Sequence, residues 1–273
     1  MPKLDLGDGV SLNYSIKGEG IPIVFVHPPV ITSVNFNYQM DGLSHKYRII
    51  TFDIRGHGQS SFSSSPLTYP LIVEDIKVLL DKLEIEKAFI CGYSTGGSIA
   101  LEFLLTYPNR SLGGIIVSGM SEVSDAYLQK KISLGVKLAS AKAKSILAMS
   151  ISLSNSNTTN LFNKMFVEAK KSHIENIKQY FRCSLQYNCT AQLENIHAPI
   201  LLVYGKKDTS FHKYAAILQK KLPNNTLKLI NENHRIPTKA AYQLNELIKI
   251  FVSEKYAQEQ YSGRQEQLIT ENN

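Results

Sequence analysis

The sequence predicts an α/β fold in which a mostly parallel, doubly wound sheet carries an inserted helical lid. Short apolar runs typical of buried strands alternate with segments whose apolar residues recur at helical spacing. This alternation stops after the first 120 residues, and the next segment has helical patterns without strands. The chain therefore divides into a core of residues 1–120 and 199–256, a lid of residues 121–198, and a polar tail of residues 257–273.

The first strands are predicted from the contrast between alternating and continuous apolar patterns. Residues 10–16 alternate apolar and polar side chains, as in a half-exposed edge strand, whereas residues 21–26 are apolar throughout, as in a strand covered on both faces. A short helix is expected near residues 36–44, and residues 47–52 supply the next strand. The sheet should therefore have an exposed edge and a buried centre.

The central segment predicts two further strands joined by amphipathic helices. Apolar residues trace one face of a helix from Leu71 to Lys82. Residues 87–91 form the following strand, a helix then runs to Tyr107, and residues 112–118 form another strand. Because strands and helices alternate, these strands should be parallel.

The last part of the core returns to the same rhythm. Residues 199–205 and 227–230 predict two strands, and residues 238–256 predict the last helix. The tail that follows is rich in Glu, Gln and Asn, and we expect it to be loosely ordered. Within the lid, residues 150–160 are rich in Ser, Asn and Thr and predict a loop.

The lid carries ten basic and five acidic residues. Charge of this kind usually marks a solvated face, and we prefer that interpretation to a role in recruiting anionic substrates. The basic residues are Lys130, Lys131, Lys137, Lys142, Lys144, Lys164, Lys170, Lys171, Lys178 and Arg182, and the acidic residues are Glu122, Asp125, Glu168, Glu175 and Glu194.

Composition excludes several classes of protein. With 273 residues and 43% hydrophobic content, the chain can bury a sizeable core. It has no run of eighteen apolar residues and no apolar leader, and its three cysteines lack metal-like spacing, so we expect a cytoplasmic protein with reduced thiols, no membrane partner and no metal. The net charge of +7 is spread along the chain, unlike the dense basic stripe of a nucleic-acid-binding surface.

The most informative stretch is Gly92-Tyr93-Ser94-Thr95-Gly96, at a predicted junction between strand and helix. A glycine on each side of the serine suits a turn so tight that a Cβ there would collide with the neighbouring strand or helix. The serine hydroxyl is then raised above the sheet, where the helix N-terminus favours negative charge on a substrate oxygen. The motif predicts a nucleophilic serine.

Residues 53–60, 92–96 and 205–208, together with His234, resemble the motifs of the α/β-hydrolase superfamily with an inserted cap. The resemblance covers the core but not the lid. It implies Ser94 as nucleophile, Asp208 as acid and His234 as base, in the chain order serine, acid, histidine. This chemistry needs an imidazole to take the serine proton and a carboxylate to hold the imidazole tautomer.

Two other residues compete with this assignment. Some members of the superfamily carry the acid after the strand predicted at residues 112–118, which makes Asp125 an alternative; we favour Asp208, since Asp125 is placed to cap a lid helix. His57 lies in a turn that resembles the family pattern Asp-x-Arg-Gly-x-Gly-x-Ser, and we expect it to have a structural role.

The loop after the second predicted strand departs from the family pattern. The family usually has His-Gly there, and the next residue's N–H completes the oxyanion hole, whereas this sequence has His27-Pro28-Pro29. Proline has no N–H to donate. We expect the oxyanion hole to use the N–H groups of Thr95 and Val30, with a side chain or water as alternatives to Val30.

The resemblance implies a serine hydrolase that cleaves a small carboxylic ester or related acyl compound through an acyl-enzyme, without a cofactor. In the superfamily the same triad also opens lactones, hydrolyses C–C bonds and runs cofactor-free perhydrolysis, and residues 92–97 are similar to perhydrolase elbows. The rival from another class is a weakly catalytic receptor for a small ligand, which Pro28 and Pro29 favour. The expected partner is a small-molecule acyl substrate, and a homodimer stays open.

Overall fold

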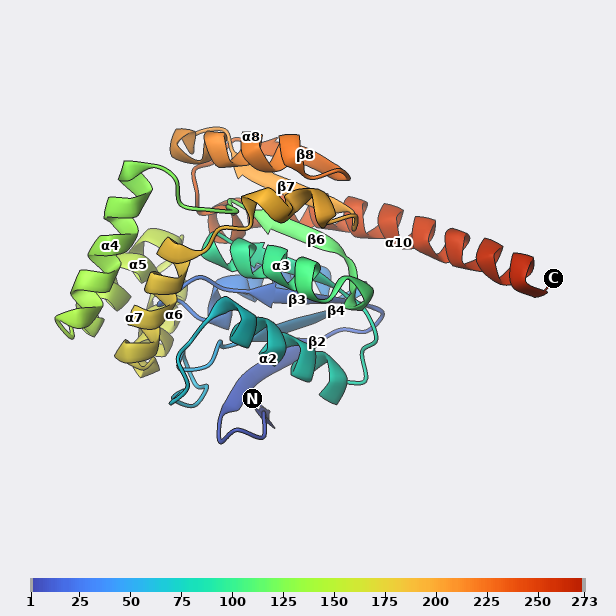
Figure 1. Cartoon of the computed structure of the whole chain (residues 1–273). Coiled ribbons are helices and arrows are strands. Elements are labelled where there is room, and N and C mark those ends of the chain that lie inside the picture. Colours follow the sequence, from blue (N-terminus) through green and yellow to red (C-terminus); the bar gives the residue numbers. More distant parts are fainter. Residues whose placement is uncertain (1, 272–273) are drawn as a thin grey trace.

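The computed structural model describes residues 2–271, and in this part of the chain eight strands form one sheet (Figure 1). The strands are Lys3–Asp5 (β1), Ser11–Lys17 (β2), Ile21–Val26 (β3), Tyr47–Phe52 (β4), Ala88–Tyr93 (β5), Ser111–Val117 (β6), Ile200–Gly205 (β7) and Asn225–Ile230 (β8). Their order across the sheet is β1-β2-β4-β3-β5-β6-β7-β8. The pairs β1–β2 and β2–β4 are antiparallel, and the other pairs are parallel, which confirms the predicted mostly parallel sheet.

Helices cover both faces of the sheet, as a doubly wound fold requires. The core helices are Asn37–Leu43 (α1), Tyr69–Lys82 (α2), Thr95–Thr106 (α3), His212–Lys221 (α8), Ile236–Lys239 (α9) and Ala241–Glu271 (α10). Side chains of a strand point alternately to its two faces, so Val24 and Val26 belong to the core cluster that contains residues of α2, α3 and α8, whereas Ile23 and Phe25 belong to the cluster that contains residues of α1 and α10. The central strands are therefore buried on both sides.

Four helices between β6 and β7 form the inserted segment. They are Ala126–Ser140 (α4), Lys144–Asn155 (α5), Thr159–Lys171 (α6) and Ile174–Gln186 (α7). In Figure 1 they gather at one end of the sheet, toward which the arrowheads of β3 and β6 point. The carboxyl ends of the parallel strands, where polar loop residues collect in α/β folds, therefore lie beneath these helices.

The loop predicted at residues 150–160 is wrong in its first half. The α5 helix continues through Asn155, and a short break follows before Thr158 caps α6 by accepting a hydrogen bond from the Leu161 N–H at 3.1 Å. The helix persists because its last residue has a tertiary partner: the Asn155 side chain accepts from the hydroxyl of Tyr93 in the core. Composition alone does not reveal such contacts.

Both ends of the chain also differ from the prediction. The β1 strand was not predicted, and it pairs with β2, so the strand near residues 10–16 is not at the edge of the sheet. The tail expected to be loosely ordered is helical as far as Glu271, because glutamate and glutamine are good helix formers and no proline interrupts α10; residues 272–273 lie outside the described residues. Nowhere in the described chain is a helix both long enough and apolar enough to span a bilayer.

Candidate active site

Ser94 occupies a sharp turn between β5 and α3. Its backbone has φ 54° and ψ −123°, a region that costs an L-residue energy and that is typical of functional sites. The two flanking glycines permit this turn: a Cβ on Gly92 would lie 2.2 Å from the Gly96 carbonyl oxygen, and one on Gly96 would lie 2.2 Å from the Val26 carbonyl oxygen. Both positions therefore require glycine, as the sequence motif predicted.

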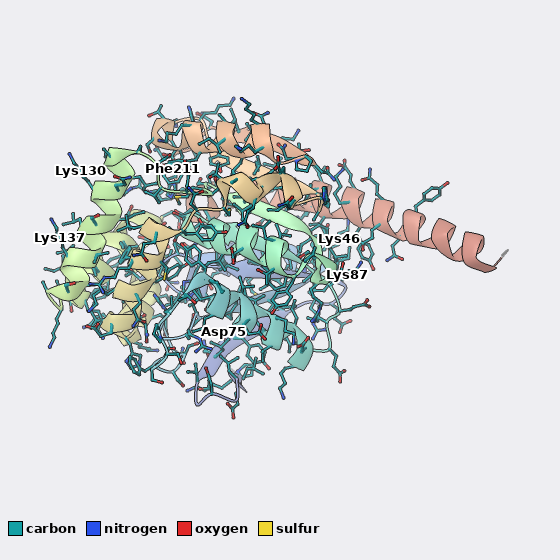
Figure 2. The ribbon with its side chains drawn as sticks, in the orientation of Figure 1. Lys46, Asp75, Lys87, Lys130, Lys137 and Phe211 are labelled. Atoms are coloured by element: carbon teal, nitrogen blue, oxygen red, sulfur yellow. The ribbon has the colours of Figure 1, made fainter. Side chains whose placement is uncertain are left out.

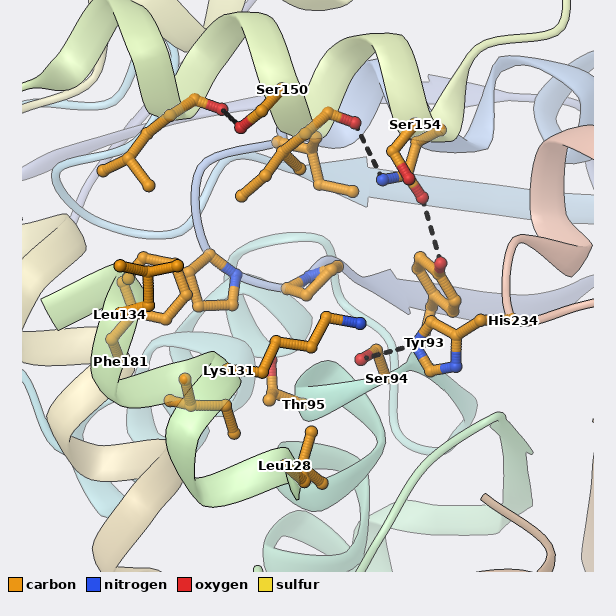
Figure 3. Close-up of a pocket in the computed structure, with 18 of the residues that line it drawn as sticks. Tyr93, Ser94, Thr95, Leu128, Lys131, Leu134, Ser150, Ser154, Phe181 and His234 are labelled. Carbon is orange, nitrogen blue, oxygen red and sulfur yellow. Dashed lines mark hydrogen bonds between the residues drawn. The ribbon is translucent and has the colours of Figure 1, made fainter. Parts of the chain in front are cut away.

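The structure brings the three predicted catalytic residues together. Asp208 follows β7 and His234 follows β8, so neighbouring strands deliver both side chains to the same end of the sheet. His234 Nδ1 lies 2.7 Å from Asp208 Oδ2, and His234 Nε2 lies 3.0 Å from Ser94 Oγ (Figure 3). Because the carboxylate faces Nδ1, that nitrogen carries the proton, and Nε2 is left to accept from the serine hydroxyl. Their catalytic roles remain predictions.

The electrostatics of the three residues suit a neutral imidazole next to an ionised carboxylate. Burial lowers the pKa of His234, and the positive charges of Lys131 and Arg235 lower it too, whereas Asp208 raises it; the net direction is downward. Burial alone would raise the pKa of Asp208, but its interactions with His234, its hydrogen bond from Ser210 and the positive charge of Lys131 together outweigh burial, and the net direction is again downward. At neutral pH the imidazole is thus able to accept a proton.

Asp125, the alternative acid, lies elsewhere. Its side chain caps α4 by accepting from the Leu128 N–H at 2.8 Å, it accepts from the Tyr214 hydroxyl, and Lys213 lies 3.7 Å away. The carboxylate that is hydrogen-bonded to His234 belongs to Asp208 instead. The expectation that Asp125 caps a lid helix is confirmed.

His57 is fully buried and does not line the pocket at Ser94. Burial lowers its pKa to about 3, so it stays neutral, and its ring packs beside those of His27 and Tyr180. In the same turn, Asp53 accepts from the Gln59 N–H at 3.0 Å. These contacts agree with the structural role expected for His57.

A cavity of about 350 Å³ opens beside Ser94 between the core and the lid. Most of the residues that line it are apolar, among them Ile31, Leu128, Ile132, Leu138, Leu147 and Phe181. The cavity is large enough for a small organic ligand, and its wall of hydrophobic side chains is typical of such sites. The part of the chain from residue 2 to residue 261 contains no group of three or more His, Cys, Asp and Glu side chains that could hold a metal ion.

Two cations also line this cavity, Lys131 from α4 and Arg235 from the loop after β8. Sequence reasoning assigned neither to the site, although two signals existed. Lys131 stands three residues after the buried Leu128 and thus on the same face of α4, and Arg235 directly follows the predicted base His234.

The predicted oxyanion hole draws on two segments, the start of α3 and the loop after β3. Thr95 is the first residue of α3 and lines the cavity, and its buried Oγ1 lies beside the hydroxyl of Tyr180. Pro28 and Pro29 also line the cavity, whereas the fully buried Val30 is not among the lining residues. Val30 has φ 76°, an unusual conformation for a β-branched residue. The part that its N–H plays stays a prediction.

Solved structures with the same architecture extend over nearly the whole chain. A thermophilic esterase from Thermogutta terrifontis superposes with a TM-score of 0.82 at 17% identity and covers 93% of this chain and 99% of its own. The enol-lactonase from Burkholderia xenovorans LB400 gives a TM-score of 0.82 at 18% identity and covers 92% and 100%. At this level of identity the likeness concerns the fold.

Curated relatives match mostly over shorter stretches. The AB hydrolase superfamily protein YisY of Bacillus subtilis is 30% identical over 114 residues, 41% of this chain and 42% of that protein. The chain spans between 30% and 42% of the length of the first three such relatives. 3-oxoadipate enol-lactonase 2 of Acinetobacter baylyi is 24% identical over 73% of this chain and 76% of its own length.

A family model described as the alpha/beta hydrolase fold matches residues 21–237, which include the elbow, both strand-end loops of the acid and the base, and the inserted helices. This match covers well over half of the chain. The chain therefore belongs to the alpha/beta hydrolase fold family.

Proposed function

We propose that this protein is a serine hydrolase that cleaves a small carboxylic ester or a related acyl compound through an acyl-enzyme on Ser94. The observation that carries the proposal is the continuous chain of hydrogen bonds from Ser94 through His234 to Asp208 at the floor of an apolar cavity. Nucleophile, base and orienting acid are recognised by this geometry rather than by sequence position.

The proposed reaction proceeds in two steps. Ser94 Oγ attacks the carbonyl carbon while His234 Nε2 takes its proton, and that proton then passes to the leaving alkoxide as the ester C–O bond breaks. Water next attacks the acyl-enzyme, with the same imidazole as base, and releases the carboxylic acid and the free serine. Asp208 holds the imidazole tautomer and stabilises the imidazolium that forms in each step.

Negative charge on the carbonyl oxygen needs donors, and Thr95 supplies the first through its N–H at the start of α3. For the second donor we retain the Val30 N–H, because strained backbone such as its φ of 76° often marks a residue that presents a functional group. The buried hydroxyl of Thr95 is the side-chain alternative. Substitution of Thr95 distinguishes the two.

Lactone opening is the second candidate reaction. It is favoured by a relative that spans 73% of this chain and is named 3-oxoadipate enol-lactonase 2. A lactone is an internal ester, so the same serine attack opens its ring, and the leaving alkoxide stays attached to the acyl group. Parallel assays with open-chain esters and lactones of the same carbon number would rank the two substrates by kcat/KM.

A fluorophosphonate probe tests the proposal most directly, because it reacts with an activated serine. We expect the probe to label Ser94 in the wild-type protein and to label neither the Ser94→Ala nor the His234→Ala variant. A panel of short-chain 4-nitrophenyl esters should then show turnover that disappears after labelling. Absence of both labelling and turnover would contradict the hydrolase and favour the receptor.

A further inference from the structure

We propose that the cavity selects substrates bearing a carboxylate, which binds between Lys131 and Arg235 while the scissile carbonyl lies at Ser94. The inference rests on the proposed function, since it names the substrate class of the same site. It adds to the proposed function because Ser94, His234 and Asp208 act on the scissile ester group and do not determine which charge the rest of the substrate carries.

Lys131 extends from the lid over the catalytic residues. In Figure 3 its side chain crosses the cavity from α4, and its nitrogen lies on the side of Ser94 and His234. Partial burial lowers the pKa of Lys131, although part of its surface is exposed, and the positive charge of Arg235 lowers the pKa further. No acidic side chain among the described residues forms an ion pair with Lys131 in this structure.

Arg235 approaches the cavity from the core side. Its Nε donates to Ser154 Oγ on α5 at 2.9 Å, which fixes the side chain against the lid. Within the described residues it too has no carboxylate within ion-pair distance. A planar guanidinium with unpaired nitrogens is well suited to bind a carboxylate through two hydrogen bonds.

The charge balance of the cavity points to a monoanion. Lys131 and Arg235 contribute two positive charges, Asp208 contributes one negative charge, and His234 is neutral before reaction. Asp208 attracts Lys131, but its carboxylate is already hydrogen-bonded to His234 and to Ser210. One positive charge therefore remains without a partner in a largely apolar cavity, where an anion would relieve the repulsion between the two cations.

Other lid cations behave differently, and this contrast makes Lys131 specific. Lys171 pairs with Glu168 at 2.6 Å, and the ammonium of Lys144 donates to the Ser172 carbonyl at 3.0 Å. On α4 itself, Lys130 and Lys137 point outward from the lid in Figure 2, and neither lines the cavity. Of these lid cations, Lys131 is the one that lines the cavity, although part of its surface is also exposed to solvent.

A matched pair of substrates tests the inference. The 4-nitrophenyl ester of pentanoic acid and the mono-4-nitrophenyl ester of glutaric acid have acyl chains of the same length, which end in a methyl group and a carboxylate. Their kcat/KM values give an anionic-to-neutral ratio for each variant. We expect Lys131→Met to lower this ratio about tenfold to a hundredfold, as expected for the loss of a hydrogen bond to a charged group. Arg235→Gln should lower it in the same direction.

Lys130→Met is the control, because it removes the same charge from the adjacent position on α4 without touching the cavity. Its ratio should equal that of the wild-type protein. Equal ratios for Lys130→Met and Lys131→Met would overturn the inference, since the effect would then come from the overall charge of the lid.

A binding measurement separates this inference from the proposed function. Calorimetry with Ser94→Ala should show that monomethyl glutarate binds more tightly than dimethyl glutarate, and that adding Lys131→Met removes the difference. If the wild-type protein turns over no ester while this charge-dependent binding is observed, the proposed hydrolysis is wrong and the anion site stands. Equal binding of the two glutarates in Ser94→Ala would refute the anion site even if the esters are hydrolysed.

Discussion

The core and the lid contribute to one cavity in different ways. The three predicted catalytic side chains, all from the core, are joined by hydrogen bonds: Ser94 to His234, and His234 to Asp208. The lid contributes a mostly apolar wall and the ammonium of Lys131, which has no ion-pair partner among the described residues. The hydrogen-bonded side chains of the core are placed to carry out the chemical step, so their substitution should act mainly on kcat. The unpaired charge of Lys131 is placed to bind part of the substrate, so its substitution should act mainly on discrimination between substrates.

The largest effect is expected from Ser94→Ala. Removing the hydroxyl costs little packing but leaves only oxyanion and binding contributions, so kcat for a 4-nitrophenyl ester should fall on the order of 10⁴-fold or more. Thermal unfolding monitored by circular dichroism should give a Tm close to that of the wild-type protein. Turnover close to the wild-type rate in this variant would remove Ser94 from the mechanism.

The second prediction compares two aspartates, Asp208 in the core and Asp125 at the start of the lid helix α4. Asp208→Asn should lower kcat about 10⁴-fold, because an amide no longer favours the tautomer that leaves Nε2 free. Asp125→Asn is the matched control: asparagine caps a helix about as well as aspartate, so α4 keeps its cap, and both the chemical step and the stability should stay nearly unchanged. The reverse ranking in ester assays would place the acid after β6.

Thr95→Val tests the core half of the oxyanion hole, because valine keeps the shape and the N–H but lacks the hydroxyl. If the hydroxyl is the second donor, kcat should fall about 10²- to 10³-fold, and Thr95→Ser should restore most of it. If the Val30 N–H is the second donor, as we predict, Thr95→Val should change kcat by less than about tenfold. A phosphonate adduct on Ser94 would show directly which atoms surround its oxygen.

The smallest effect is expected from the charge of the lid residue Lys131 on the core residue His234. The charge of Lys131 lowers the pKa of His234, so Lys131→Met should raise that pKa. Because the base must be neutral, the acid limb of the pH profile of kcat/KM for a neutral ester should move to higher pH. Lys130→Met should leave the limb in place. A shift to lower pH, or an equal shift in both variants, would show that Lys131 does not act on His234.

Features coded by local pattern were predictable from sequence. The glycines around Ser94 follow from the geometry of one turn, and the positions of Asp208 and His234 follow from the order of strands. Local pattern failed where a distant contact decides the structure. Helix α5 continues through a stretch rich in Ser and Asn because Asn155 meets Tyr93, and the position of Lys131 over Ser94 depends on how α4 crosses the core.

The bond between Tyr93 and Asn155 also bears on how molecules enter and leave. Tyr93 immediately precedes the nucleophile, and its buried hydroxyl donates to Asn155 on α5 at 3.0 Å, while Arg235 bonds Ser154 on the same helix. Lifting α5 would leave these groups unsatisfied, at a cost of about 1–3 kcal/mol for a buried group, or roughly a 5- to 150-fold slower opening. Lys131 and Leu134 of α4 line the cavity and are exposed, so a substrate that enters past them avoids this barrier. We therefore expect α5 to stay in place while substrate and product pass on the side of α4.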